Sequence, residues 1–313
     1  MQLKRILFKH TVVCAALGSV LGLPLGGAFA AVTTSDADPS VLELATDSSA
    51  TGAATPVLIE NQIYETKHSD CCIGDVYQPA PDVGSSLPAV VVVHGGAWTG
   101  GSKSDSDIRD IARLLVDSGF VVFSINYRLI DEGGRFPHNI DDVQSAVAFL
   151  SRHASQYRVD PTRVSLLGVS AGAYLSLMAA YSPGFGRQHL RAVIAVCPAT
   201  DLRQVPEALT AEYLGDKIEK GSRVLKKSSP LNLAKFGIPT LIVHGTEDKV
   251  VPFEQSSRLE KALKKANVAV RLVSLNGAAH NFLLNDNSQR QLAFNEIQHY
   301  LERNLSIEDS YLN

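Results

Sequence analysis

The strongest constraint on the fold of this chain is a short segment, GVSAG at 168–172. An apolar run at 164–167 precedes it, and a helix-forming run at 173–180 follows it. The segment therefore predicts a sharp strand–turn–helix connection, whose glycines and small residues let the two arms approach each other. Ser170 would project its hydroxyl from the strained corner of that turn. A plain glycine turn is the alternative, and signals elsewhere in the chain bear on the choice.

Apolar strand-like runs alternate with helical patterns through the rest of the chain. Strands are predicted near 88–94, 121–126, 163–168, 191–197, 239–244 and 269–274. Helices are predicted near 106–118, 139–155, 171–182, 254–266 and 287–304. This alternation favours an α/β fold with a mostly parallel central sheet and helices on both faces. With 45% hydrophobic and 19% charged residues among 313, the chain has material for a sizeable core.

A glycine pair directly follows the first predicted strand, in the sequence HGGAW at 94–98. Glycines in this position expose backbone N–H groups, which an acyl-transfer enzyme needs to hold a developing oxyanion. With Ser170 downstream, we expect the N–H of Ala171, together with that of Gly96 or Ala97, to form such an oxyanion hole. An ordinary glycine loop after a parallel strand is the alternative.

Two later loops supply a candidate acid and a candidate base. Glu247 and Asp248 follow the fifth predicted strand, and His280 follows the sixth. We assign the acid to Asp248, which stands just before a hydrophobic-Val-Pro turn. Without the candidate serine, either carboxylate would be interpreted as a solvated turn residue or a helix cap. The order Ser170, Asp248, His280 is the chain order of nucleophile, acid and base in the α/β-hydrolase fold.

Over roughly residues 60–304 the chain resembles the α/β-hydrolases of the esterase/lipase type. It is similar within them to the small carboxylesterases with an HGGxW loop, which include acetyl- and feruloyl-esterase-like proteins and the arylformamidases. Supporting motifs are NYRL at 126–129 and FPHNIDDV at 136–143. Ala97 departs from the third glycine of many relatives, which puts the shape of the adjoining acyl pocket in question.

The resemblance implies a mechanism for these residues. Ser170 would be the nucleophile, His280 the general base, and Asp248 the group that orients the imidazole. An acyl-enzyme would form on Ser170 and be resolved by water, with no metal and no organic cofactor required. Trp98 would line the acyl or alcohol side of the site, or would pack in the core. We interpret Tyr127 and Arg128 as supporting the walls of the site rather than taking part in the chemistry.

The first 30 residues have the pattern of a secretory signal peptide. Three basic residues precede an uncharged run at 11–35, and AFA at 28–30 fits a cleavage site before Ala31. An uncleaved membrane anchor is the alternative. We therefore expect an exported protein, periplasmic or secreted, without stable membrane insertion after cleavage. Residues 31–55 are rich in Ala, Ser, Thr and Asp, and predict a flexible leader.

The catalytic domain is expected over 56–313, with a small cap at about 198–238. Segment 1–30 holds three of the 29 Lys and Arg and none of the 32 Asp and Glu, so its removal changes the net charge from −3 to −6. No basic stripe supports nucleic-acid binding. Cys14 lies in the signal segment. Cys71, Cys72 and Cys197 remain, an odd number that leaves at least one free thiol or an intermolecular bridge.

These observations favour an exported serine carboxylesterase acting on short-chain acyl esters, either small molecules or esters linked to polysaccharide. An amide-cleaving relative, an arylformamidase or a serine peptidase, is the first alternative. A non-catalytic binding protein with the hydrolase fold is the second. Such proteins lose members of the triad, whereas this chain keeps Ser170, Asp248 and His280 in order. The oligomeric state is left open.

Overall fold

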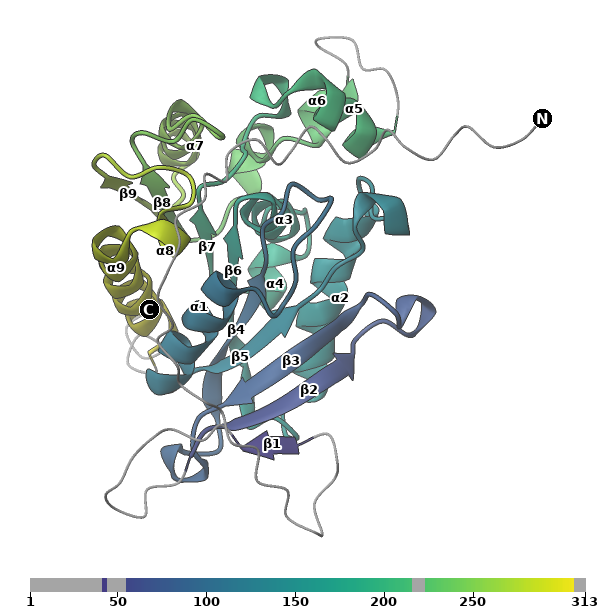
Figure 1. The fold of residues 1–313 in the computed structure, drawn as a ribbon, viewed down its shortest axis with the longest axis vertical. Helices are drawn as coiled ribbons and strands as arrows, with labels where there is room; N and C mark the ends of the chain where they lie inside the picture. Colours follow the sequence, from purple (N-terminus) through teal and green to yellow (C-terminus); the bar gives the residue numbers. More distant parts are fainter. Residues whose placement is uncertain (1–40, 44–54, 216–222, 307–313) are drawn as a thin grey trace, which may run out of the picture. The chain divides into compact units, whose positions relative to one another are not determined.

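The computed structural model describes residues 41–43, 55–215 and 223–306. In this part of the chain, nine strands form one sheet in the order β1-β2-β3-β5-β4-β6-β7-β8-β9 (Figure 1). The run from β5 to β9 is parallel throughout, whereas β1, β2 and β3 are antiparallel at one edge. The mostly parallel α/β sheet expected from the sequence is therefore confirmed.

Each of the six predicted strands corresponds to one strand of the parallel part, and the antiparallel edge was not predicted. The strands are Val41–Glu43 (β1), Val57–Ile63 (β2), Ile73–Gln78 (β3), Leu87–Val93 (β4), Val121–Ile125 (β5), Val159–Val169 (β6), Ala192–Val196 (β7), Thr240–Gly245 (β8) and Val270–Leu275 (β9).

The five predicted helices are present as α1, α2, α3, α7 and α9. The helices are Ser106–Asp117 (α1), His138–Arg152 (α2), Ala171–Ala180 (α3), Gly186–His189 (α4), Glu207–Leu214 (α5), Arg223–Lys227 (α6), Glu254–Lys265 (α7), Phe282–Asn285 (α8) and Asn287–Leu305 (α9). Short 3-10 helices lie at Thr66–His68 (η1), Pro81–Val83 (η2), Ile130–Glu132 (η3), Leu202–Gln204 (η4) and Pro230–Phe236 (η5).

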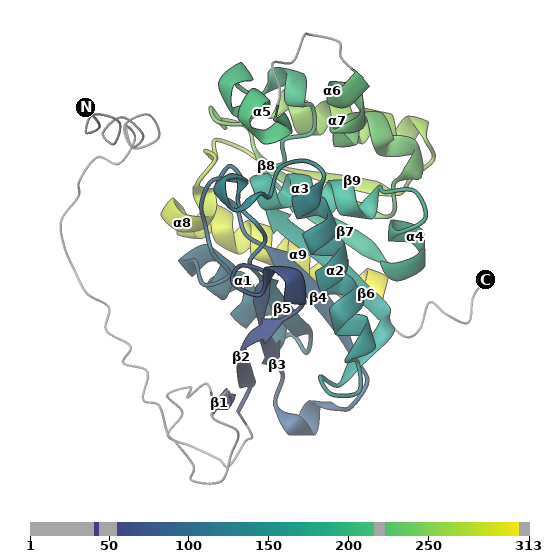
Figure 2. The same cartoon turned by 90° about the vertical axis from the view of Figure 1, so that its right-hand side faces the viewer.

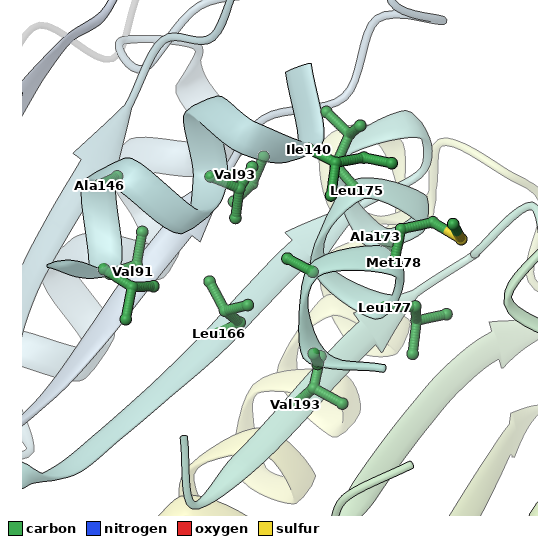
Figure 3. Packing of buried hydrophobic residues seen from close by; sticks show 14 of the residues in the cluster. Val91, Val93, Ile140, Ala146, Leu166, Ala173, Leu175, Leu177, Met178 and Val193 are labelled. Atoms are coloured by element: carbon green, nitrogen blue, oxygen red, sulfur yellow. The ribbon is translucent and has the colours of Figure 1, made fainter. Parts of the chain in front are cut away.

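Helices cover both faces of the sheet, because neighbouring residues of a strand point to opposite sides. Val91 belongs to the core under α2, α3 and α7, whereas Val90 belongs to the core under α1, α8 and α9. Figure 3 shows Val91, Leu166 and Val193, from three adjacent strands, beneath α2 and α3. The alternation places apolar side chains in two cores and leaves the carboxyl ends of the strands free to carry polar loops.

The segment between β7 and β8, residues 197–239, carries η4, α5, α6 and η5; we call it the β7–β8 insertion. The cap predicted near 198–238 falls here, with 216–222 outside the described residues. In both ribbon views α5 and α6 lie beyond the carboxyl ends of the central strands (Figures 1 and 2).

Most of the predicted N-terminal segments fall outside the described residues, including all of the predicted signal peptide. Within the predicted leader, Val41–Glu43 forms β1, because its backbone pairs with β2. For these three residues the structure differs from the expected flexible leader. Among the helices that the structure describes, none has the length and apolar character needed to cross a membrane.

Candidate active site

Ser170 occupies the turn between β6 and α3 in a conformation that non-glycine residues rarely adopt, with φ 53° and ψ −114°. Two glycines make this turn possible. A Cβ added at Gly168 would lie 2.2 Å from the carbonyl oxygen of Gly172. A Cβ added at Gly172 would lie 2.2 Å from the carbonyl oxygen of Val93, at the end of β4. The close approach expected from the sequence therefore exists, and it holds the serine at the corner.

The structure brings Ser170 together with His280 and Asp248. His280 Nε2 is 2.9 Å from Ser170 Oγ, and His280 Nδ1 is 2.6 Å from Asp248 Oδ2. The three residues follow β6, β9 and β8, whose carboxyl ends meet at one edge of the sheet. A hydroxyl bonded to an imidazole that is itself oriented by a carboxylate is the arrangement that activates a serine nucleophile.

The acid of this arrangement is buried and strongly hydrogen-bonded. Asp248 Oδ1 accepts the N–H groups of Val250 and Val251, each at 2.8 Å. Burial would raise the pKa of Asp248, but the hydrogen bonds from His244, His280 and Val251 outweigh it and hold the pKa well below its usual range. Asp248 is therefore an anion under ordinary conditions.

Glu247, the carboxylate not assigned, lies away from the imidazole. Its side chain is 60% exposed and pairs with Lys249 at 3.0 Å. The geometry therefore favours Asp248 as the acid.

His244 is a polar residue of the site that the sequence analysis missed. It lies on β8, is fully buried, and places Nε2 3.0 Å from Asp248 Oδ2 and 2.9 Å from the carbonyl oxygen of Val251. Its Nδ1 is 2.6 Å from Ser256 Oγ, on α7. A histidine at the end of an apolar strand, four residues before a candidate acid, was the available signal.

The glycine loop after β4 lies against the serine turn. A Cβ added at Gly95 would be 3.2 Å from the carbonyl oxygen of Val169 and 3.5 Å from Ser170 Cβ. Gly96 and Ala97 have φ values of 110° and 52°, so the loop backbone is held in an unusual conformation.

The N–H groups predicted for an oxyanion hole are free to donate to a ligand oxygen. Within the described residues, no acceptor is bonded to the backbone N–H of Gly96, Ala97 or Ala171. Ala171 is the first residue of α3, where a helix leaves its N–H groups without partners of its own.

Trp98 lies in an aromatic cluster and is only 2% exposed. Its ring stacks on Tyr213 of α5 at a centroid distance of 4.4 Å and meets Tyr174 of α3 edge-on at 5.1 Å. Tyr213 is fixed by a 2.8 Å hydrogen bond to Asn139 Oδ1. These contacts are those of the core-packing alternative, and they join the β7–β8 insertion to the loop after β4.

Arg128, which the sequence interpretation assigns to the wall of the site, forms an ion pair with the buried Asp142. Arg128 Nη2 is 2.6 Å from Asp142 Oδ1, and the backbone N–H of Arg128 donates to Asp142 Oδ2 at 3.0 Å. The Asp142 side chain is only 2% exposed. The two motifs NYRL and FPHNIDDV are therefore joined by this pair. It braces the chain beside Tyr127, whose ring stacks on His94 at 4.4 Å.

One set of side chains in the described region has metal-ligating atoms within 4.8 Å of one another, and it comprises Cys197, Asp248 and His280. Burial and the nearby Asp248 raise the pKa of the Cys197 thiol, which disfavours the thiolate that binds metals. His280 Nδ1 is already bonded to Asp248. The arrangement fits proton transfer better than metal binding. Cys71, Cys72 and Cys197 are all free thiols.

Comparison with known proteins agrees with the fold. A family model described as BD-FAE matches residues 74–263. The chain is 28% identical over 222 residues to Esterase LipC of Mycobacterium tuberculosis, in a match that covers 64% of this chain and 55% of that protein. The chain thus spans about half the length of the curated relatives it matches.

Two solved structures illustrate the fold. The thermophilic esterase Est2 of Thermogutta terrifontis superposes with a TM-score of 0.64 at 25% identity, covering 80% of this chain and 92% of that one. A truncated carbohydrate esterase from gut microbiota superposes with a TM-score of 0.68 at 22% identity, covering 80% and 96%. Since the family model matches more than half of the sequence and the fold is that of solved esterases, this chain belongs to the BD-FAE family of α/β-hydrolase esterases.

Proposed function

We propose that this protein is a serine carboxylesterase that hydrolyses short-chain acyl esters through an acyl-enzyme on Ser170. The observation that carries the proposal is the continuous hydrogen-bonded chain from Ser170 through His280 to Asp248, with distances of 2.9 and 2.6 Å. Relatives named as esterases and carboxylic ester hydrolases support the same reaction class.

The proposed reaction has two halves. Ser170 Oγ attacks the ester carbonyl carbon while His280 Nε2 takes the hydroxyl proton, and the carbonyl oxygen becomes an oxyanion. The N–H groups of Ala171 and of Gly96 or Ala97 would bind that oxyanion. The oxyanion collapses, the carbon–oxygen bond to the alcohol breaks, and the imidazolium returns its proton to the leaving alkoxide.

Water then resolves the acyl-enzyme by the same route. His280 removes a proton from the attacking water, a second oxyanion forms, and Ser170 leaves with the proton that the imidazole returns. Asp248 remains an anion throughout and stabilises the imidazolium in both halves. The products are an alcohol and a carboxylic acid.

We also propose that the protein is exported and that its substrate is a small-molecule ester or an ester linked to polysaccharide. The basic, apolar and small-residue pattern of 1–30 supports export. An exported esterase would meet substrates outside the cytoplasm. N-terminal sequencing of the protein recovered from the producing cells tests this, and an N-terminus at Ala31 is expected.

An arylformamidase or serine peptidase would use the same three residues. The assay that separates these readings is hydrolysis of p-nitrophenyl esters, acetate through laurate, by the chain starting at Ala31, with a serine-directed fluorophosphonate as probe. We expect turnover that is greatest for short acyl chains and labelling at Ser170. Labelling without ester turnover would favour formamides or peptides as substrates. The absence of both labelling and turnover would favour a binding protein.

Ser170→Ala is the decisive variant. Loss of the nucleophile should lower kcat on the order of 10⁶-fold while circular dichroism shows an unchanged fold. Persistent turnover in this variant would refute the acyl-enzyme.

A further inference from the structure

Two imidazoles meet the same carboxylate oxygen. His280 Nδ1 and His244 Nε2 lie 2.6 and 3.0 Å from Asp248 Oδ2. Only His280 continues to the serine. His244 is fully buried, so no solvent reaches it to satisfy its nitrogens, and the proposed reaction does not use it.

The hydrogen positions on His244 follow from its neighbours. Nε2 faces the carboxylate of Asp248 and, at 2.9 Å, the carbonyl oxygen of Val251. Both are acceptors, so Nε2 carries the hydrogen. Nδ1 is 2.6 Å from the hydroxyl of Ser256. When Nε2 carries the single ring hydrogen, Nδ1 has a free lone pair, and a hydroxyl can donate to it. Ser256 therefore donates to Nδ1.

These bonds immobilise both oxygens of Asp248. Oδ1 accepts the N–H groups of Val250 and Val251. Oδ2 accepts His244 Nε2–H from β8 and His280 Nδ1–H from the loop before α8. Without His244, the carboxylate would keep Val250, Val251 and His280, which all lie on loops, and would lose the hydrogen bond that ties it to β8.

We propose that His244 is a positioning residue that acts through Asp248, and that Ser256 sets its tautomer. The inference rests on the proposed function, because it concerns the same acid. The hydrogen-bonded chain then runs from Ser256 on α7 through His244, Asp248 and His280 to Ser170. These hydrogen bonds connect His280, which lies on a loop, to the buried strand β8 and to α7.

The test compares His244→Leu, which removes the donor, with His244→Gln, whose amide can still donate to Asp248. We expect His244→Leu to lower kcat for p-nitrophenyl acetate about 10- to 100-fold with KM within about twofold, because a misplaced acid misorients the base. His244→Gln should retain kcat within about fivefold. Equal losses in the two variants, or a wild-type kcat in His244→Leu, would overturn the proposal.

A double-mutant cycle tests whether His244 acts through Asp248. In the Asp248→Asn background, His244→Leu should lower kcat by less than about twofold further, because the residue it positions is already lost. Multiplicative losses would show that His244 acts by another route.

His153→Leu is the matched control for loss of a histidine. His153 is half-buried at the end of α2, where Nδ1 lies 2.9 Å from the carbonyl oxygen of Phe149. His153 has no hydrogen bond to the site residues. The kcat of His153→Leu should therefore equal that of the wild type. Thermal unfolding of every variant separates a loss of folding from a loss of orientation.

A second measurement does not depend on activity. Nitrogen NMR of the histidine-labelled protein should show His244 at neutral pH with hydrogen on Nε2 and none on Nδ1, and Ser256→Ala should disturb this pattern. A hydrogen on Nδ1 of His244 would refute the assignment even if esters are hydrolysed. If no ester is hydrolysed by the wild type while the tautomer is as assigned, the proposed function fails and the hydrogen-bonded chain stands.

Discussion

Adding a single methyl group at Gly172 should damage the site without touching any reacting atom. The Cβ of an alanine there would lie 2.2 Å from the carbonyl oxygen of Val93 and 2.3 Å from that of His94. Both are backbone atoms at the carboxyl end of β4, which cannot rotate away as a side chain can. To reach ordinary contact, the start of α3 and the end of β4 must separate by about 1 Å.

That separation moves Ser170 relative to the loop at 94–98, since the two flank the same contact. A misplacement of about 1 Å can cost about 10²-fold in rate, and overpacking costs about 1–3 kcal/mol of unfolding free energy. We therefore expect Gly172→Ala to lower kcat/KM for p-nitrophenyl acetate about 10²-fold. Urea unfolding of the same variant measures the loss of stability.

Gly100→Ala is the matched control. A Cβ at Gly100 meets nothing within 4 Å, although the residue lies in the same loop region. This variant should keep the wild-type kcat/KM and unfolding free energy. Wild-type values in Gly172→Ala, or equal losses in the two variants, would refute the reasoning from close approach.

Three further predictions follow from the site. Asp248→Asn should lower kcat about 10⁴-fold, whereas Glu247→Gln, an exposed carboxylate, should change kcat by less than about twofold; the reverse pattern would move the acid to Glu247. Asp142→Asn should lower the unfolding free energy in urea by about 3 kcal/mol, because it leaves Arg128 without its buried counter-ion, and unchanged stability would contradict this. The pKa of Asp248 is held below its ordinary 3.8, so its contribution to stability is complete above that pH and is lost as the pH falls through the folded-state pKa. The stability difference between the wild type and Asp248→Asn should therefore shrink below pH 3.8, and a constant difference would exclude the linkage.

The sequence predicted the parallel part of the sheet because most of its strands are buried on both faces, unlike the partly exposed edge strand β9. The apolar runs of the buried strands are nearly continuous, as in VVVV at 90–93. Each can therefore be recognised without knowing which strand it pairs with. The strand β3, with the sequence IGDVYQ, gave no such signal. Its buried Asp75 pairs with Lys103, 28 residues later, at 2.7 Å and accepts the backbone N–H of Asn61 at 2.9 Å. A contact so distant in the chain leaves no local pattern.

The residues of the site likewise fall into those that a local sequence pattern predicts and those that it does not. Ser170, Asp248 and His280 could be assigned because each stands in a recognisable loop after a strand. His244 could not, because its role depends on hydrogen bonds to Asp248 and Ser256 that only the folded chain creates. The burial of Trp98 likewise depends on a helix of the β7–β8 insertion, whose position no motif reveals.

The β7–β8 insertion has a consequence for how proteins of this architecture can diversify. The chain leaves the sheet after β7 and returns at β8, and these strands are adjacent and parallel, so the ends of the insertion are fixed by the sheet itself. Ser170, Asp248 and His280 all lie on other connections. Doubling the length of a flexible loop costs only about 0.6 kcal/mol in closure entropy. A recombined or lengthened insertion would therefore reshape the surroundings of the serine while the framework carrying the three residues is inherited unchanged.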